Sequence, residues 1–108
     1  MVGAGALGCE FMKAFALMGI GCGAQGLVSV TDNDNIEVSN LNRQFLFRKH
    51  HVGKSKSECA SASAKEMNPA LNVQCFTNLV APSTETLFND EFWDSMNFVV
   101  NALSLIHI

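Results

Sequence analysis

Acidic, amide and cationic side chains between residues 31 and 56 have the types and order of a nucleotide site. Asp32 and Asp34 come directly after the short apolar run 27–30, Arg43 lies close to Asn40, and Lys56 opens a later segment. A carboxylate at a strand end can bind ribose hydroxyls, and cations can bind phosphates. The pattern therefore predicts a site for a phosphorylated nucleoside.

A glycine-rich turn precedes these residues. Residues 3–8 form a complete Gly-x-Gly-x-x-Gly, in which Gly3 allows a tight turn, Gly5 lets a phosphate approach the backbone and Gly8 lets a helix pack closely. The helix expected over 9–18 would offer its positive end to that phosphate. Gly3, Gly5, Ala6 and Gly8 are therefore candidate cofactor-binding residues.

Strands and helices alternate in the elements that must position this site. Helices are expected over 9–18, 55–67 and 82–88, and strands over 27–31, 71–78 and 97–103. Ser39 is a possible cap of one more helical segment. This order predicts an α/β fold, with a Rossmann-like parallel sheet and flanking helices.

The first strand of that sheet is expected to be largely missing. A glycine fingerprint normally closes a strand of several apolar residues, and here only Met1 and Val2 precede it. Because this strand is central in such sheets, we expect a truncated sheet whose neighbouring strands lack backbone partners.

Composition bounds the function classes. A formal net charge of −3 and 48% hydrophobic residues indicate one globular domain and argue against a general nucleic-acid or anionic-membrane binder. Five of the seven Lys and Arg fall between positions 43 and 56, which suits a polyanion or a solvated basic face. No apolar run approaches the roughly 20 residues of a membrane-spanning helix.

The cysteines and histidines predict no metal centre. Cys9, Cys22, Cys59 and Cys75 lack metal-ligand spacing, which favours a reducing intracellular compartment and makes Cys9 a small core residue. The pair at 50–51 has no third ligand at useful spacing, so solvent-facing loop histidines are expected. Residues 45–47 are expected to be core or interface apolar residues, and Phe92 and Trp93 are expected to be packing aromatic residues.

The string of residues 32–48, Asp-x-Asp-x-Ile-x-x-Ser-Asn-Leu-Asn-Arg-Gln-Phe-Leu-Phe-Arg, resembles the signature of the active adenylation domain of ubiquitin-activating enzymes. The same family includes activators of ubiquitin-like proteins and bacterial sulfur-carrier adenylating enzymes. The resemblance runs from residue 3 to residue 103, and segments 18–23, 84–85 and 89–92 favour the ubiquitin type.

The resemblance implies adenylation of a protein's C-terminal carboxylate with Mg-ATP, before thioester transfer. It implies that Asp32 holds the ribose, Arg43 and Lys56 hold the phosphates, and Asn40 contacts the reacting region. Arg43, Lys56 and Asn40 would be the catalytic residues. Asp34 would help to hold a metal, orient Arg43 or cap a turn. The cofactors implied are ATP and Mg²⁺.

The resemblance also implies partners and a location. The partners are ubiquitin or a ubiquitin-like protein, conjugating enzymes, a second adenylation-type repeat and a domain that carries the thioester-forming cysteine. None of the four cysteines here is assigned that role. Cytoplasm and nucleus are the expected locations, with no nucleic acid or membrane as partner.

The C-terminal residues depart from the family pattern. Where the family has a magnesium-binding Asp after the last strand, this chain has Ser104, and residues 103–108 resemble the translation of a sequencing adaptor. We therefore expect residues 1–103 to be a partial ATP-binding adenylation domain and 104–108 to be a non-native tail. The chain alone is expected to be unable to complete the reaction.

Two alternatives stay open. A Rossmann domain of an NAD-dependent oxidoreductase would also explain the glycine fingerprint and Asp32, but gives no reason for the polar segment around Arg43. An activator of another ubiquitin-like protein would share every motif named above.

Overall fold

The computed structural model describes residues 1–103. Its principal elements are α1 (Ala6–Met18), β1 (Val28–Thr31), α2 (Lys56–Met67), β2 (Val73–Phe76) and α3 (Asp90–Asp94). The strands β1 and β2 pair in parallel, with Val28 opposite Val73 and Thr31 opposite Phe76. The predicted α/β architecture with a parallel sheet is therefore confirmed.

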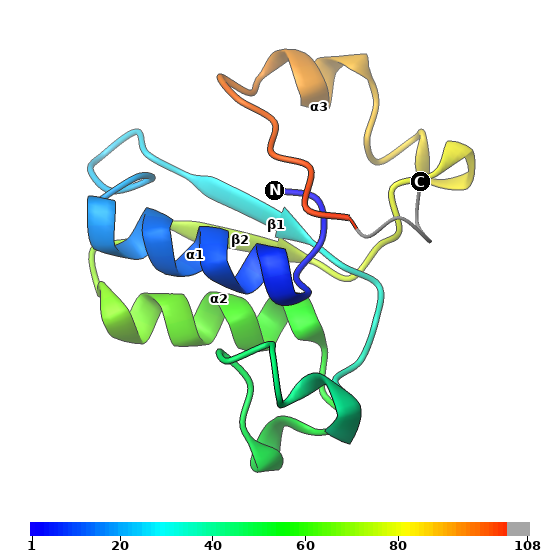
Figure 1. Cartoon of the computed structure of the whole chain (residues 1–108). Coiled ribbons are helices and arrows are strands. Elements are labelled where there is room, and N and C mark those ends of the chain that lie inside the picture. The colour runs from blue at the N-terminus through cyan, green and yellow to red at the C-terminus, as the bar shows by residue number, and fades with distance from the viewer. Residues whose placement is uncertain (104–108) are drawn as a thin grey trace.

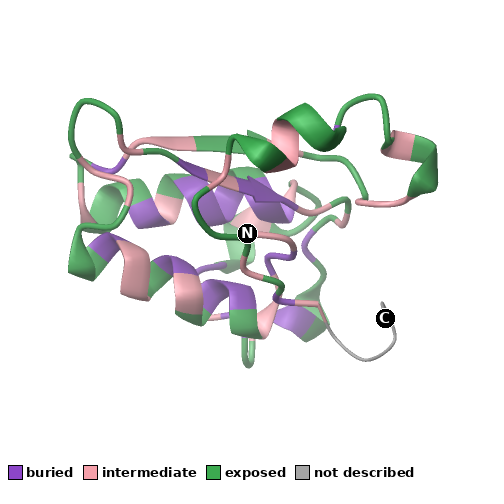
Figure 2. Cartoon of the chain, turned by 90° about the horizontal axis from the view of Figure 1, so that it is seen from above, coloured by how far each residue is buried: buried purple, intermediate pink, exposed green. Residues whose placement is uncertain are grey.

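The elements form layers on the two sides of the sheet. Figure 1 shows α1 and α2 side by side on one face of β1 and β2, while α3 and the chain that follows it lie on the other side. Figure 2 shows that buried residues concentrate on α1, α2 and β1, whereas α3 is largely exposed. The main core therefore lies between the sheet and the helix pair.

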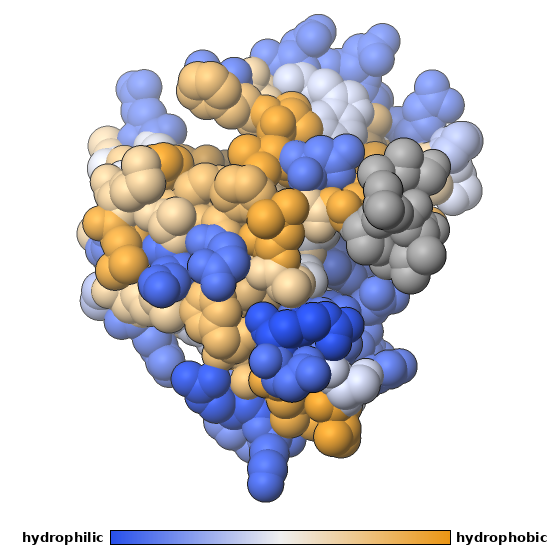
Figure 3. All heavy atoms as spheres, in the orientation of Figure 1, coloured by the Kyte–Doolittle hydropathy of each residue, from blue (hydrophilic) through white to orange (hydrophobic). Residues whose placement is uncertain are grey.

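The exposed surface of α1 includes large apolar side chains. Leu17 and Met18 are exposed to 66% and 71%, and Leu7 to 51%. Figure 3 shows apolar residues spread over the region that α1 occupies in the same view. Glu10 and Lys13 are exposed on the same helix, so its outer surface mixes large apolar and charged side chains.

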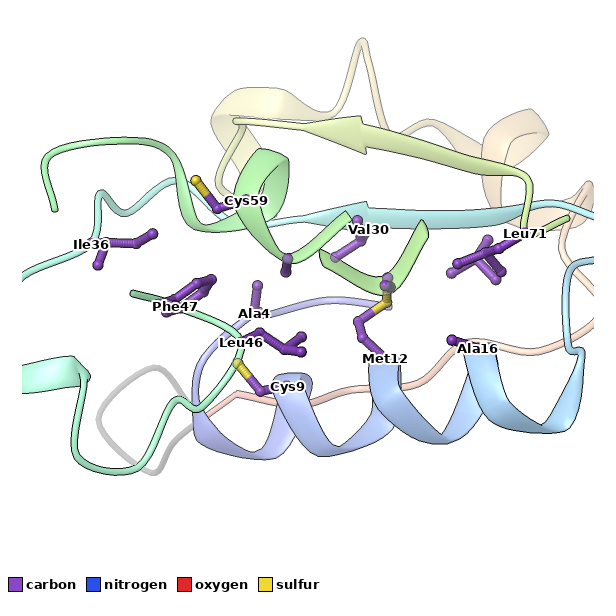
Figure 4. Close-up of a cluster of buried hydrophobic side chains, with 13 residues drawn as sticks. Ala4, Cys9, Met12, Ala16, Val30, Ile36, Leu46, Phe47, Cys59 and Leu71 are labelled. Atoms are coloured by element: carbon purple, nitrogen blue, oxygen red, sulfur yellow. The ribbon is translucent and has the colours of Figure 1, made fainter. Parts of the chain in front are cut away.

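The core joins the helices to the segment after β1. Figure 4 shows Met12 and Ala16 of α1 pointing toward the side where Val30 of β1 and Leu71 lie. Phe47 and Ile36, both almost fully buried, extend the same cluster toward the carboxyl end of β1. The packing of residues 36–47 on this core fixes the polar side chains in that segment.

Val2 occupies the central position of the sheet. It forms parallel bridges with Thr31 on one side and Asn101 on the other. Its N–H donates to Val100 O at 2.8 Å, and its carbonyl accepts from Ala102 N–H at 2.7 Å. The expected first strand is thus represented by this single bridging residue.

The predicted strand over 97–103 is wrong. Only Asn101 forms a bridge among these residues, and Phe98 and Val99 are exposed to 88% and 54% rather than buried. A strand needs several consecutive backbone hydrogen-bond partners on a neighbouring strand, and Val2 provides only one such residue. The strand expected over 71–78 exists, but β2 is shorter, at Val73–Phe76.

Helix boundaries also differ from the expectations. Ser39 begins no helix, because a 3₁₀ turn over Val38–Asn40 follows Glu37, whose N–H donates to Asn40 Oδ1 at 2.8 Å. The helix expected over 9–18 starts three residues earlier, at Ala6. The predicted α2 is confirmed, with Ser55 as its cap.

The helical segment expected over 82–88 is shorter than predicted. A 3₁₀ turn covers Pro82–Thr84, and the separate helix α3 begins after Asn89, whose side chain accepts from Phe92 N–H at 2.9 Å. Phe92 and Trp93 pack with Phe76 and Phe88 in edge-to-face and tilted contacts. Their predicted packing role is confirmed.

Candidate nucleotide site

One large cavity lies at the carboxyl end of β1. Its volume is about 1080 Å³, which is ample for a nucleotide. Its walls come from the glycine turn, the residues after β1, the start of α2 and two later segments. The lining residues are Val2, Gly3, Gly5, Ala6, Leu7, Thr31, Asp32, Asn33, Asp34, Asn35, Glu37, Asn40, Arg43, Gln44, Lys56, Asn78, Leu79, Val80, Ala102 and Leu103.

Gly3 and Gly8 serve the packing of the turn itself. Gly3 has a φ of +101°, and a Cβ there would lie 2.7 Å from Ala102 O. A Cβ on Gly8 would lie 2.5 Å from Gly3 O, so the third glycine lets α1 approach the turn. Gly8 does not line the cavity, so a role of Gly8 in cofactor binding stays a prediction, which would act through the packing of the turn.

Gly5 and Ala6 face the cavity at the start of α1. A Cβ on Gly5 would meet only Gln44 Nε2, at an ordinary contact distance of 3.7 Å. The chain's own packing therefore does not require glycine here, while a phosphate approaching the backbone would. Gly5 precedes α1 without a side-chain cap, which leaves the positive end of this helix to other partners.

The carboxylate of Asp32 is held by two backbone donors. Asp32 Oδ2 accepts from Ala4 N–H and Oδ1 accepts from Asp34 N–H, both at 2.8 Å. The first bond ties the end of β1 to the glycine turn. Each oxygen keeps a second lone pair, so the carboxylate can still accept from ribose hydroxyls.

Lys56 is a buried cation rather than an exposed residue at a helix start. Its side chain is 10% exposed, and its Nζ lies 4.0 Å from Asp34 Oδ2, whose side chain is 47% exposed. The backbone N–H of Lys56 also donates to Asp34 O at 3.1 Å. Because 4.0 Å exceeds a hydrogen-bond distance, the ammonium retains donors for a phosphate.

Arg43 and Asn40 come to the cavity from the segment after β1. The Arg43 guanidinium donates to Ser39 O at 2.9 Å and to Asn42 Oδ1 at 3.2 Å. Among the described ion pairs Arg43 has no bond to Asp34, so the expectation that Asp34 orients it is wrong. Asn40 is buried, and its Oδ1 accepts from the backbone of the preceding turn.

Gln44 lines the cavity, although the sequence shows it only as one of the hydrogen-bonding side chains around Arg43. It is 3% exposed and lines the cavity, and its Oε1 has no hydrogen-bond partner within residues 1–103. The sequence shows Gln44 only as one of several polar residues in a row. Nothing in that row distinguishes a buried amide from an exposed one.

The cysteine and histidine side chains outside the cavity lie in different environments. Burial raises the pKa of the Cys9 thiol to about 11, which makes it a poor nucleophile and confirms it as a core residue. His50 is exposed and His51 is half-buried. Within residues 1–103 no group of three His, Cys, Asp or Glu can hold a metal. The same residues include no helix that is long and apolar enough to span a membrane.

Proteins of known sequence match this chain closely. The "Ubiquitin-activating enzyme E1 2" of Arabidopsis thaliana is 54% identical over 103 residues, which cover 95% of this chain and 10% of that protein. The "Ubiquitin-like modifier-activating enzyme 1" of Mus musculus is 52% identical over 106 residues, which cover 98% and 10%. The chain therefore spans about a tenth of the length of these relatives.

Solved structures match the fold. The E. coli tRNA N6-threonylcarbamoyladenosine dehydratase TcdA in complex with AMP aligns with a TM-score of 0.70 and 29% identity over 81% of this chain and 33% of its own. E. coli MccB with ATP gives 0.70 and 30% identity over 82% and 25%. The profile of the ThiF family matches residues 1–107. With this match over nearly its whole length, the chain belongs to the ThiF family.

Proposed function

We propose that this chain supplies the ATP-binding wall of an adenylation site in a ubiquitin-activating enzyme. The observation that carries the proposal is that eight of the nine residues selected from the sequence line a single cavity: Gly3, Gly5, Ala6, Asp32, Asp34, Asn40, Arg43 and Lys56. They come from four separate segments of the chain. Relatives that contain this domain are named as ubiquitin-activating enzymes, and two structural relatives were solved with AMP or ATP.

The reaction proposed needs positioning and positive charge rather than a base. The C-terminal carboxylate of the modifier, already ionised at neutral pH, attacks the α-phosphorus of ATP. A carboxyl–phosphate bond forms as the bond to the β-phosphate oxygen breaks, and pyrophosphate leaves. Arg43 and Lys56 stabilise the phosphate charge, and Asp32 holds the ribose. Loss of one such donor typically costs roughly 100- to 1,000-fold in rate.

Asp34 is a carboxylate of the cavity that fits a magnesium ion. Its side chain is half-exposed in the cavity and its nearest cation is 4.0 Å away. Mg²⁺ is commonly held by one or two carboxylates together with substrate phosphates. When bound, the ion would neutralise phosphate charge. The other ligand expected from the family pattern falls at Ser104, outside the described residues.

The exposed apolar surface of α1 supports a partner domain. Leu17 and Met18 are both more than half exposed and lie outside the cavity lining, on a helix whose other side is already packed. The relatives are about ten times longer than the match, so most of their chain is available to cover this face. We assign the cover to the second adenylation-type repeat. The catalytic-cysteine domain and conjugating enzymes are further proposed partners, and cytoplasm and nucleus the proposed locations.

A chimaeric enzyme tests the proposed activity. Residues 1–103 would replace the matching segment of the Arabidopsis relative, which is 54% identical over 103 residues. Ubiquitin-dependent exchange of labelled pyrophosphate into ATP then reports adenylation. We expect an active chimaera that loses at least roughly 100-fold of its activity on Lys56→Ala or Arg43→Ala.

Lys54→Ala is the matched control for the chimaera. Lys54 lies two positions before Lys56, is exposed and does not line the cavity. Its change should leave exchange unaltered. A folded chimaera in which Lys56→Ala and Arg43→Ala behave like Lys54→Ala would contradict the proposed function.

A further inference from the structure

His51 closes the turn over residues 48–54 with both its backbone and its side chain. Its N–H donates to Arg48 O, and its carbonyl accepts from Lys54 N–H, both at 2.9 Å. Its Nδ1 in turn accepts from the backbone N–H of Arg48 at 2.9 Å. His51 is the third residue of the 3₁₀ turn Lys49–His51, a position from which a glutamate or glutamine side chain commonly accepts from the N-cap N–H. The imidazole thus caps this turn.

This cap exists in only one protonation state of His51. A backbone N–H can donate but cannot accept, so Nδ1 must present a lone pair to Arg48. The neutral imidazole does so when its proton is on Nε2. The imidazolium carries a proton on both nitrogens, and its Nδ1–H would face the Arg48 N–H. Protonation therefore removes the bond and leaves two donors opposed.

The surroundings of the imidazole also disfavour its charged form. Partial burial is the largest cause that lowers the pKa of His51 from its ordinary 6.5, followed by the positive charges of His50, Lys54 and Arg48. The His50 ring lies against it, with ring centroids 4.1 Å apart. Glu66 of α2 acts in the opposite direction. The capped turn therefore keeps His51 neutral to a lower pH than an unstructured chain does.

The capped turn is joined to the wall of the nucleotide cavity. Gly53 N–H donates to Ile36 O, and Ile36 N–H donates to Lys54 O, both at 2.8 Å. Further along, Lys56 N–H donates to Asp34 O at 3.1 Å, and both of these residues line the cavity. Because the turn leads directly into these bonds, its shape determines where Lys56 lies relative to Asp34.

We propose that His51 is a pH-sensitive cap, whose protonation opens the turn and loosens the hydrogen bonds that join residues 53–56 to residues 34–36. Below pH 6.5 the uncapped turn takes up a proton that the capped turn excludes, so the stability that the cap contributes is lost as the pH falls. The effect on ATP rests on the proposed function, since Asp34 and Lys56 line the same cavity. Acidification should thus weaken nucleotide binding through a residue that does not line the cavity.

A pH titration of the isotope-labelled chain by NMR tests the cap without any substitution. We expect His51 to titrate below pH 6.5, and the amide signals of Arg48 and Gly53 to shift with the same midpoint. The Arg48 amide reports the cap, and the Gly53 amide reports the bond to Ile36. A His51 midpoint at or above 6.5, or an amide signal of either residue that does not follow it, would overturn the proposal.

Two variants separate the cap from the charge of this turn. His51→Gln keeps an acceptor at the capping position but cannot titrate, so both amide signals should stay constant between about pH 7.5 and 5.5. His50→Gln is the matched control, because it removes the exposed neighbouring imidazole and leaves the cap in place. Its amide signals should still respond to pH. A response that persists in His51→Gln would assign it to another group and overturn the proposal.

Calorimetry of ATP binding connects the cap to the cavity. Between about pH 7.5 and 5.5, the affinity of the unchanged chain should fall roughly 2- to 10-fold more than that of His51→Gln, as expected for the loss of one hydrogen bond. The protonation of ATP itself is the same in both experiments. Equal losses would overturn the link between the cap and the cavity. If the folded chain binds no ATP at either pH, the proposed function fails, while the NMR titration still decides the cap.

Discussion

Asp32 Oδ2 accepts a hydrogen bond of 2.8 Å from the backbone N–H of Ala4, which joins the end of β1 to the glycine turn. The same carboxylate accepts from Asp34 N–H through its other oxygen. Asp32 is therefore part of the frame of the site before any ligand arrives. A residue proposed to hold ribose thus also positions the turn that faces the phosphate.

This double role predicts that Asp32→Ala changes stability as well as binding. Loss of two bonds to a carboxylate should lower the free energy of unfolding by about 1–3 kcal/mol, which urea denaturation can measure. Asp32→Asn should keep part of this stability, because the amide oxygen still accepts one N–H, while ATP affinity falls in both variants. Equal stability of Asp32→Ala and the unchanged chain would show that the Ala4 bond contributes nothing.

Arg43→Ala is expected to act on ligand affinity and not on folding. The guanidinium is exposed and bonds only to neighbouring residues, so stability should change by less than about 0.5 kcal/mol. ATP affinity should fall roughly 10- to 100-fold, with little change for adenosine. Arg48→Ala is the control, since Arg48 is exposed but lies outside the cavity lining. Comparable losses in both variants would indicate a general charge effect.

The buried thiol of Cys9 predicts a loss of stability in alkali. Burial raises its pKa from 9.0 to about 11, so above pH 9 the unfolded chain releases a proton that the folded chain keeps. Stability therefore falls as the pH rises, by about 1 kcal/mol at pH 10. Urea denaturation at pH 7 and pH 10 should show this loss in full in the unchanged chain and in Cys75→Ala, where the exposed cysteine is removed. The loss should be smaller in Cys9→Ala, where only Cys59 keeps a pKa raised by burial. An undiminished loss in Cys9→Ala would assign it to another group.

The apolar surface of α1 predicts self-association of the chain when it is alone. Leu17→Lys combined with Met18→Lys places charges where both side chains are more than 60% exposed. Sedimentation should show less association, while ATP affinity stays the same because neither residue lines the cavity. A chain that is already monomeric without these substitutions would contradict the prediction that α1 mediates self-association.

Sequence patterns predicted the elements that carry the site better than they predicted the C-terminal strand of the sheet. The glycine turn, β1 and α2 have strong local signals in glycine spacing, apolar runs and the cap at Ser55, and all three are present. Residues 97–103 have the apolar pattern of a strand, but a strand also needs a neighbour. Only Val2 supplies one, and the apolar pattern of residues 97–103 carries no information about that neighbour.

Within the site, residue type was easier to predict than environment. Asp32 and Lys56 reach the cavity as expected, but the burial of Lys56 and the bond between Asp32 and Ala4 depend on contacts across the chain. The burial of Gln44, which is 3% exposed, likewise depends on contacts that the polar row around Arg43 does not show.

Calorimetry of ATP binding to the purified chain, with and without Mg²⁺ and with NAD as competitor, is the most direct test of a nucleotide site built on Asp32, Arg43 and Lys56. We predict binding in the micromolar range that NAD does not displace and that Asp32→Ala or Arg43→Ala weakens. We also predict that the chain alone catalyses no ubiquitin-dependent pyrophosphate exchange. A cooperatively folded chain that binds no ATP, or that prefers NAD, would contradict the assignment of this cavity.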